Sequence, residues 1–196
     1  MGRKHVWMAT ILGMLILLSP LMCKEIQEKA PLTLFDFSRP DDLKGWNIIS
    51  DRLLGGNSWG ELRPSPHHSV LFSGTLQGEN SGSFCMAYST RKQLQLRAFS
   101  GLLLRLKGDG KHYKLRIYTR SNIEGVSYQA GFNTRKNRLI TVFLPFSSFI
   151  PFLGRRVVRD WPILDQSSIT HLGIMISDQV PGTFHLEIYW IKAKSH

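Results

Sequence analysis

Hydrophobic and polar residues alternate one by one through much of this chain of 196 residues. The stretch YKLRIYT, residues 113–119, places Tyr113, Leu115 and Ile117 on one face and more polar side chains on the other. Successive side chains of a β-strand point to opposite faces, so this pattern is typical of a strand with one buried face. The stretch therefore predicts a strand that covers a hydrophobic core.

A second alternating stretch lies near the C-terminus. In FHLEIYWI, residues 184–191, the predicted hydrophobic face carries Phe184, Leu186, Ile188 and Trp190. Eight further hydrophobic or alternating runs, separated by clusters of Gly, Pro, Asn, Asp and Ser, also predict strands. They span residues 32–37, 46–50, 70–74, 85–90, 101–108, 126–132, 139–146 and 171–177.

The runs 101–108, 139–146 and 171–177 hold enough hydrophobic residues to predict central strands of a sheet. No stretch after residue 30 keeps the 3.6-residue period of a helix. About ten short strands predict an all-β fold, an antiparallel β-sandwich of the jelly-roll type. This domain is expected to span residues 32–194, after a linker of residues 24–31.

The composition agrees with a globular domain that has a sizeable core, because hydrophobic residues make up 42% and charged residues 20%. The net charge is +11 and the sequence pI is about 10.0. The part after residue 30 keeps 21 basic against 12 acidic residues, so an excess of +9 belongs to the folded domain. This charge favours an acidic partner, and the sequence leaves open an acidic protein, an anionic lipid or nucleic acid.

The first 23 residues differ from the rest of the chain. Arg3 and Lys4 precede an apolar run at residues 6–22, which is the layout of a secretory signal peptide. The run also reaches the short limit for an uncleaved anchor, which would associate the protein with a membrane through residues 6–22. Cys23 lies at the end of this segment, so Cys85 is expected without a disulfide partner.

The stretch GNSWG, residues 56–60, matches the Gly-x-Ser-x-Gly pattern of a serine-hydrolase nucleophile. Such a serine needs a helix directly after it, and Pro64 and Pro66 forbid one here. This context argues against a catalytic Ser58. The sequence also lacks paired carboxylates, a Cys–His dyad, a phosphate loop and metal-ligand spacings, so we expect no catalytic residue, no metal and no cofactor.

The residues Gly108, Asp109 and Gly110 lie between two predicted strands, 101–108 and 113–119. The triplet resembles the start of a dinucleotide-binding loop but lacks the third glycine and the following helix. Asp-Gly is a favoured pair in tight turns, so the triplet predicts a β-hairpin turn that joins the two strands directly.

With these segments in order, the chain from about Leu34 to Ala193 resembles the complex I intermediate-associated protein 30 family. The resemblance rests on FDF with WNIISDRLLGGNSWGEL, FSGTLQGENSGSFCMAYST, GLLLRLKGDGKHYKLRIYT, VFLPFSSFIPFLGRRV and LDQSSITHLGIMISDQVPGTFHLEIYWI. It implies a galactose-binding-like sandwich in which GNSWG belongs to a conformational Gly-Gly turn. It also implies a non-enzymatic, chaperone-like assembly factor that binds partly assembled intermediates or membrane-arm subunits of mitochondrial respiratory complex I.

The chain departs from the family's pattern in three places. The family usually has an aromatic residue, often tryptophan, before the strand that leads to LPF, but KNRLITVFLPF has no tryptophan there. Leu53 and Leu54 replace the more usual Val-Met beside the glycine pair. The N-terminus also lacks the amphipathic, Arg-rich character of a mitochondrial presequence. Two compartments therefore stay open. The resemblance implies the mitochondrion, and the N-terminal segment implies the secretory pathway, the ER or a membrane anchor.

Recognition residues of a β-sandwich typically lie in the loops at its end. Trp59 and the arginine pair of residues 154–156 carry stacking and anion-binding side chains, whereas the glycines and aspartates of these loops also suit a purely conformational role. The candidate binding residues are Asp51, Gly55, Gly56, Ser58, Trp59, Asp109, Arg155, Arg156 and Asp178.

A rival function is a secreted or ER-lumenal module that recognises a glycan or a protein through these loops, with Trp59 or Trp161 as an aromatic platform. Nucleic-acid binding is a third class. We expect no specific nucleic acid, because no strand interleaves aromatic and basic residues as single-strand binders do. A second basic cluster, Arg135, Lys136 and Arg138, is typical of a solvated surface.

Overall fold

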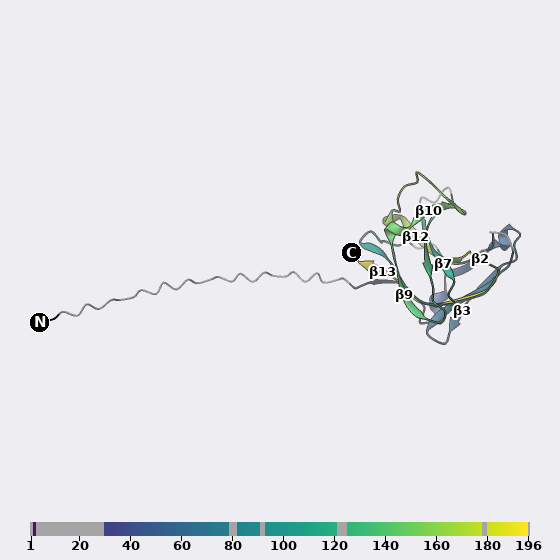
Figure 1. The fold of residues 1–196 in the computed structure, drawn as a ribbon, viewed down its shortest axis with the longest axis horizontal. Coiled ribbons are helices and arrows are strands. Elements are labelled where there is room, and N and C mark those ends of the chain that lie inside the picture. The colour runs from purple at the N-terminus through teal and green to yellow at the C-terminus, as the bar shows by residue number, and fades with distance from the viewer. Residues whose placement is uncertain are drawn as a thin grey trace.

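Two antiparallel sheets that share one core make up the fold (Figure 1). The computed structural model describes residues 30–78, 82–90, 93–120, 125–177 and 180–195, together with Gly2. Within these residues lie thirteen strands and four short 3-10 turns, but no α-helix. The all-β antiparallel sandwich that the alternation predicts is therefore confirmed.

One sheet has six strands, and its central strand β13 pairs with three others. The order across this sheet is β3 (Trp59–Ser65), β4 (Ser69–Leu76), β13 (Gly182–Ser195), β6 (Phe99–Gly108) and β9 (Leu139–Pro145). The sixth strand, β1 (Leu32–Asp36), pairs with the C-terminal half of β13.

The other sheet has seven strands. Its order is β11 (Arg156–Val157), β10 (Ile150–Leu153), β8 (Val126–Asn133), β7 (His112–Thr119), β12 (Ile169–Ile176), β5 (Cys85–Ser89) and β2 (Trp46–Ser50). Four single 3-10 turns lie between strands, namely η1 (Pro40–Leu43), η2 (Asp51–Leu54), η4 (Phe146–Ser148) and η5 (Gln166–Ser168).

The core lies between the sheets and is built from the alternating positions that the sequence predicts. β6 contributes Leu102, Leu104 and Leu106. β7, in the other sheet, contributes Tyr113, Leu115 and Ile117. All of these side chains are fully buried. Burying one such side chain stabilises a fold by about 1.5–3 kcal/mol, so the two layers are held together mainly by these contacts.

Residues 108–110 do not form the predicted hairpin, because β6 and β7 belong to different sheets. Gly110 has a positive φ of 95°, as in a tight turn, but the chain crosses there from one layer to the other. The carboxylate of Asp109 accepts hydrogen bonds from the Tyr113 hydroxyl at 3.1 Å and from the His185 N–H at 3.0 Å. These bonds join β7 to β13 of the opposite sheet where the chain crosses.

The predicted hydrophobic face of residues 184–191 extends only to Ile188. The pairing of β13 with β6 skips Tyr189, which forms a β-bulge. A bulge reverses which of the following side chains face the core. Ile191 is accordingly fully buried, and Trp190 is only partly buried on the outer face. The prediction that Trp190 shares the core face with Ile188 is therefore wrong.

The sheet edges also differ from the prediction. β6 and β12 are interior strands as predicted, but β9 is the edge of its sheet, with Leu139 and Phe143 43% and 41% exposed. A hydrophobic run by itself does not say which strand lies at an edge. The sequence also misses β3, β10 and β11. Pro64 obscures β3, and the strand tolerates it because β3 is an edge strand.

The described part of the chain contains no helix long and apolar enough to cross a membrane. Residues 3–29, which hold most of the predicted signal or anchor segment and of the 24–31 linker, lie outside the described residues. The first strand begins at Leu32 and the last one ends at Ser195. The division into residues 1–23, 24–31 and 32–194 stays a prediction.

Gly74→Ala tests the close approach of β3 and β4. Gly74 lies opposite Gly60, and a Cβ there would collide with the Trp59 carbonyl and lie 2.9 Å from the Phe184 ring. We expect urea unfolding to report a loss of about 1–3 kcal/mol. Ser73→Ala, on the other face of β4, should change stability by less than about 0.5 kcal/mol. Equal effects of the two substitutions would contradict the packing argument.

Candidate binding site

The outer face of the seven-stranded sheet is hollowed by a cleft of about 550 Å³. Side chains of the middle strands β7, β8 and β12 form its floor, namely Lys114, Arg116, Gln129 and Met175. Its walls come from η2, from the segment before β5, and from β10 with the turn that follows it. They supply Leu54, Ser83, Phe84, Phe152, Gly154 and Arg155. Two loops predicted to bind, 51–58 and 154–156, thus meet over this sheet.

Arg116 is the central cation of the floor. In the strand register it lies between Gln129 of β8 and Gly173 of β12. Its Nε and Nη2 donate to Ser127 Oγ at 3.1 and 2.6 Å, and its guanidinium carbon lies 5.5 Å from the centre of the Tyr118 ring. Because these partners are neutral, they orient the guanidinium without neutralising its charge.

Tyr118 continues this arrangement along the outer face. Its ring stacks on His171, with ring centres 4.3 Å apart and an interplanar angle of 3°, and its hydroxyl lies 3.5 Å from Met86 Sδ. Burial raises the pKa of the Tyr118 hydroxyl, so the phenol stays neutral beside the guanidinium of Arg116. His171, Tyr118 and Arg116 therefore form one stack of side chains on the sheet.

Two further cations line the cleft. Lys114 Nζ donates to Ser177 Oγ at 2.8 Å, and Arg155 comes from the exposed turn between β10 and β11. The described residues that line the cleft include no Asp or Glu. Neither Arg116 nor Arg155 forms an ion pair with another described residue. The described lining residues therefore carry a positive net charge, which favours an anionic ligand.

Gln129 carries an unpaired polar group on the same floor. Its side chain is only 5% exposed, although it lies on the outer face of β8. Its Nε2 has no hydrogen-bond partner among the described residues. A buried donor without an acceptor costs about 1–3 kcal/mol, so an acceptor from a ligand in the cleft would stabilise the complex.

Asp51 supports the wall that carries Leu54. Its buried carboxylate accepts hydrogen bonds from the N–H of Ser58 at 2.9 Å, from the Ser58 hydroxyl at 2.6 Å and from the N–H of Phe84 at 3.2 Å. Gly56 packs against this carboxylate so closely that a Cβ would collide with it. The predicted turn residues therefore hold the loop in place, and Leu54 is the residue of this loop that reaches the cleft.

Ser58 is fully buried, and its hydroxyl donates to Asp51 and accepts from the N–H of Gln77 at 3.0 Å. A serine nucleophile needs solvent access and an adjacent general base, so this geometry is that of a structural hydroxyl. The thiol of Cys85 is buried too, and burial raises its pKa to about 12. Among the described residues, no group of three His, Cys, Asp or Glu is placed to hold a metal ion.

The structure brings together only part of the predicted binding set. Arg155 lines the cleft, and Gly55, with a φ of 85°, ends the 3-10 turn at the cleft wall. Three other candidates do not line it, namely Arg156 in β11, Trp59 in β3 and Asp109 at the β6–β7 corner. Asp178 lies outside the described residues, directly after Ser177.

Sequence reasoning missed the floor of the cleft. Alternation places Lys114 and Arg116 on the outer face of residues 113–119. This polar face is the feature of the sequence that could have indicated the floor of the cleft. Only the strand order shows that Gln129 and Met175 lie beside them, because β8 and β12 flank β7 from different parts of the chain.

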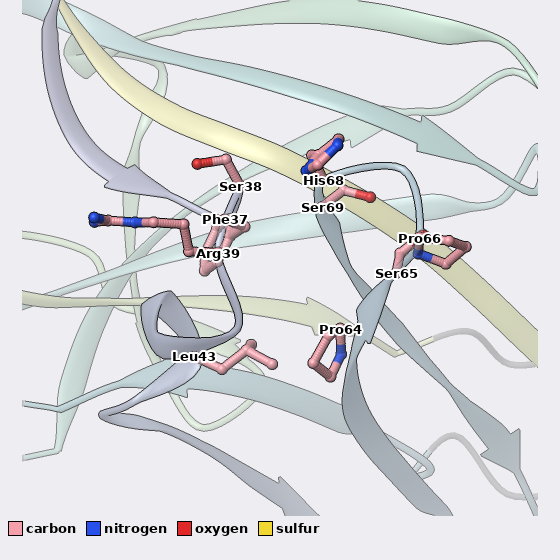
Figure 2. Close-up of a pocket in the computed structure, with 9 residues that line it drawn as sticks. All are labelled: Phe37, Ser38, Arg39, Leu43, Pro64, Ser65, Pro66, His68 and Ser69. Carbon is pink, nitrogen blue, oxygen red and sulfur yellow. The ribbon is translucent and has the colours of Figure 1, made fainter.

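A smaller hollow of about 260 Å³ lies where the segment after β1 meets the β3–β4 turn (Figure 2). Two of its lining residues, Ser65 and Ser69, donate to Oε1 of Glu187 at 2.6 and 2.7 Å, and His67 Nδ1 lies 2.9 Å from the same oxygen. A Ser–His–acid triad would use both imidazole nitrogens in series. Here all three groups converge on one carboxylate oxygen, so the cluster is structural.

The outer face of the six-stranded sheet carries basic and aromatic side chains together. Lys192 Nζ lies 4.6 Å from the centre of the Trp190 ring, and Lys194 Nζ lies 5.4 Å from that of Phe143. Arg105 lies opposite Trp190 on β6. The bulge of β13 thus turns one aromatic residue, Trp190, to the face of the lysines, whereas Phe143 belongs to β9. The expectation that no strand interleaves aromatic and basic residues stays a prediction.

The fold is an antiparallel β-sandwich, with a cleft on the outer face of its seven-stranded sheet. A family 11 carbohydrate-binding module from Clostridium thermocellum, in complex with a mixed-linked tetrasaccharide, matches 84% of this chain and 95% of its own with a TM-score of 0.62 and 16% identity. The agarase AgWH50C matches 86% of this chain and 25% of its own with a TM-score of 0.60 and 10% identity. At these identities the likeness shows the fold alone.

Residues 35–188 match the model of the complex I intermediate-associated protein 30 family, and the chain belongs to this family. It is 30% identical to complex I intermediate-associated protein 30, mitochondrial, of Mus musculus over 85% of this chain and 56% of that protein. The probable counterpart of Caenorhabditis elegans is 28% identical over 80% and 52%. The predicted family is confirmed, and the chain spans about half the length of these relatives.

Asp51→Asn tests the support of the cleft wall. An amide at this position turns one acceptor oxygen into a donor that faces the donors of Ser58 and Phe84, so we expect a loss of about 2–4 kcal/mol in unfolding free energy. Asp41→Asn, which removes only an exposed ion pair with Lys44, should cost less than about 1 kcal/mol. Similar losses in the two variants would refute the role of Asp51.

Glu187 predicts a specific pH dependence. Burial by itself raises its pKa, but hydrogen bonds from Ser65, Ser69 and His67 outweigh burial and hold the pKa below the ordinary value of 4.5. The carboxylate therefore contributes stability above about pH 4.5, and the contribution is lost as the pH falls through the lowered pKa. Glu187→Gln should flatten the fall in unfolding free energy on the acid side of about pH 4.5.

Urea unfolding from about pH 6 to about pH 3 measures this slope. Glu61→Gln, which removes a more exposed carboxylate from β3, serves as the matched control and should keep the wild-type slope. An unchanged slope in Glu187→Gln would show that the buried carboxylate does not contribute in this way.

Proposed function

We propose that this chain acts as an assembly factor for mitochondrial respiratory complex I and binds incomplete subunits or assembly intermediates through the cleft and its rim. Membership of the family supports this role, and so do the names of the mouse and nematode relatives. The partner is a protein, namely a membrane-arm subunit or an intermediate that contains one. The role is chaperone-like, because the protein binds a partner that is not yet assembled.

Large hydrophobic side chains are exposed on the turn η2 and at the end of strand β10, and this observation is the main support for the proposal. Leu53 and Leu54 are 73% and 81% exposed in η2, beside the buried bonds between Asp51 and Ser58. Leu153 is 51% exposed next to the opposite wall. Apolar side chains on a rigid loop lose little entropy on binding. They suit the hydrophobic surface that an unassembled subunit still exposes.

A role without catalysis is supported by the state of Ser58 and of the described cysteine, Cys85. The Ser58 hydroxyl is fully buried, and the pKa of the Cys85 thiol is raised to about 12, so little thiolate forms at neutral pH. The positive cleft offers cations and hydrogen-bond donors for recognition. We place this function in the mitochondrion, in line with the names of the relatives.

Replacing Leu53 and Leu54 with Asp tests the proposal. The full chain and this double variant are expressed in cells that lack the endogenous protein. Native gels of solubilised mitochondria then report comigration with complex I intermediates and the amount of mature complex I. We expect the full chain to comigrate with intermediates and to restore complex I, and the double variant to lose at least about tenfold of both.

Ile163→Asp is the matched control, because Ile163 is 93% exposed and does not line the cleft. This variant should behave as the unchanged chain, and thermal unfolding should show both variants to be folded. If the double variant comigrates as well as the control, the rim is not the binding surface. If the unchanged chain comigrates with no intermediate, the assembly role itself is refuted.

A further inference from the structure

Gln129 places an unpaired hydrogen-bond donor in the floor of the cleft. Gln129 is 5% exposed and lines the cleft, and its Nε2 is buried without a partner among the described residues, so the amide must turn toward the cleft to meet a ligand. Burying such a group is unfavourable unless an acceptor completes it. The floor is therefore suited to a ligand that presents an acceptor oxygen beside Gln129.

The cations around Gln129 specify the charge of that acceptor. Arg116 is the direct neighbour of Gln129 across the β7–β8 pair, and Lys114 and Arg155 also line the cleft. The hydroxyl of Ser127 and the ring of Tyr118 hold the Arg116 guanidinium in position. No carboxylate is present among the described lining residues. An oriented cation beside an amide donor suits an oxyanion, which both groups can bind at once.

The apolar side chains of the walls indicate which chemical group is attached to the anion. Leu54, Phe84 and Phe152 reach the cleft from three separate segments, and Met175 adds a polarizable thioether to the floor. A volume of about 550 Å³ is large enough for an anionic group together with one or two side chains. Apolar walls favour a carboxylate on a hydrophobic residue over inorganic phosphate, because phosphate would leave these walls without a contact.

We infer that this cleft binds a carboxylate with an adjoining hydrophobic side chain from an extended segment of a protein partner. The carboxylate accepts from Gln129 and Arg116, and the hydrophobic side chain lies between Leu54 and Phe152. A chain terminus and an acidic side chain supply the same chemistry. This inference rests on the proposed function for the source of the segment, since it takes the ligand to be part of a protein.

Acetylated dipeptides of known composition test the inference on the purified full chain. Acetyl-phenylalanyl-leucine has a free terminal carboxylate, its C-terminal amide has none, and acetyl-phenylalanyl-aspartyl amide carries the carboxylate on a side chain. Isothermal titration should give binding of at least one carboxylate dipeptide about tenfold or more tighter than the amide. The carboxylate dipeptide that binds more tightly shows whether the partner presents a chain terminus or an acidic side chain. Equal affinity for all three dipeptides would overturn the inference.

Two substitutions locate the bound dipeptide. Gln129→Leu removes the unpaired donor, and Arg116→Met removes the charge but keeps the apolar stem. Each should weaken the preferred dipeptide by about tenfold. Arg105→Met removes the same charge from the outer face of the other sheet and should change affinity less than about twofold. Unchanged affinity in Gln129→Leu and Arg116→Met would place the ligand elsewhere and refute the site.

The folding of the variants and competition by inorganic phosphate are measured as well. Thermal unfolding should show Gln129→Leu to be at least as stable as the unchanged chain, because the substitution removes an unpaired buried donor. If Arg116→Met does not fold, Arg155→Met on the exposed turn is used in its place. This variant should also weaken binding of the preferred dipeptide. Inorganic phosphate that displaces the dipeptide completely at equal concentration would identify a phosphate site and overturn the carboxylate assignment.

The dipeptide measurement contains no component of complex I, so its failure is distinguishable from failure of the proposed function. The dipeptides could fail to bind while the double variant of Leu53 and Leu54 still loses comigration with complex I intermediates. This result would refute only the carboxylate site. Selective binding of a carboxylate dipeptide by a chain that comigrates with no intermediate would refute the assembly role and leave the chemistry of the cleft in place.

Discussion

Buried hydrogen bonds between Asp51 and Ser58 join the two sheets beside the cleft. Asp51 directly follows β2 of one sheet, Ser58 directly precedes β3 of the other, and the Ser58 hydroxyl also accepts from Gln77 after β4. Ser50 adds a hydrogen bond to the Ser58 carbonyl at 2.9 Å. An interior carboxylate is tolerated only where fixed donors surround it, so these bonds restrict the conformation of the turn. The position of the Leu54 wall depends on it.

The floor of the cleft depends on a second constraint. The residues next to its cations on the neighbouring strands are glycines. Arg116 lies opposite Gly173, and Lys114 lies opposite Gly131. The space beside Gly173 is already filled, because a Cβ there would lie 2.8 Å from Met86 Sδ. A Cβ at Gly131 would likewise meet the ring of His112, so glycine at these two positions leaves room for Met86 and His112 beside the cations. Charge and hydrophobic surface therefore occur in one site, a combination that suits a polypeptide ligand.

Local patterns predicted the faces of the strands well wherever the strands are regular. Leu102, Leu104 and Leu106 are buried as expected, because period-2 alternation is a direct consequence of strand geometry. The same rule failed at Trp190, where one additional residue in β13 shifts the period. In the candidate site, turn chemistry pointed to Asp51 and Arg155. It could not point to the floor, which is assembled from three strands that are distant in the sequence.

The sequence by itself determined the all-β class, the core-facing residues of regular strands and the family, because each follows from local alternation or from the order of short segments. Only the tertiary structure decided that β6 and β7 lie in different layers, that β9 lies at an edge, and that Gln129 lies beside Arg116. The physical reason is that strand order depends on hydrogen bonds and core contacts between distant segments. A local pattern shows which face of a strand is buried but not which strand lies next to it.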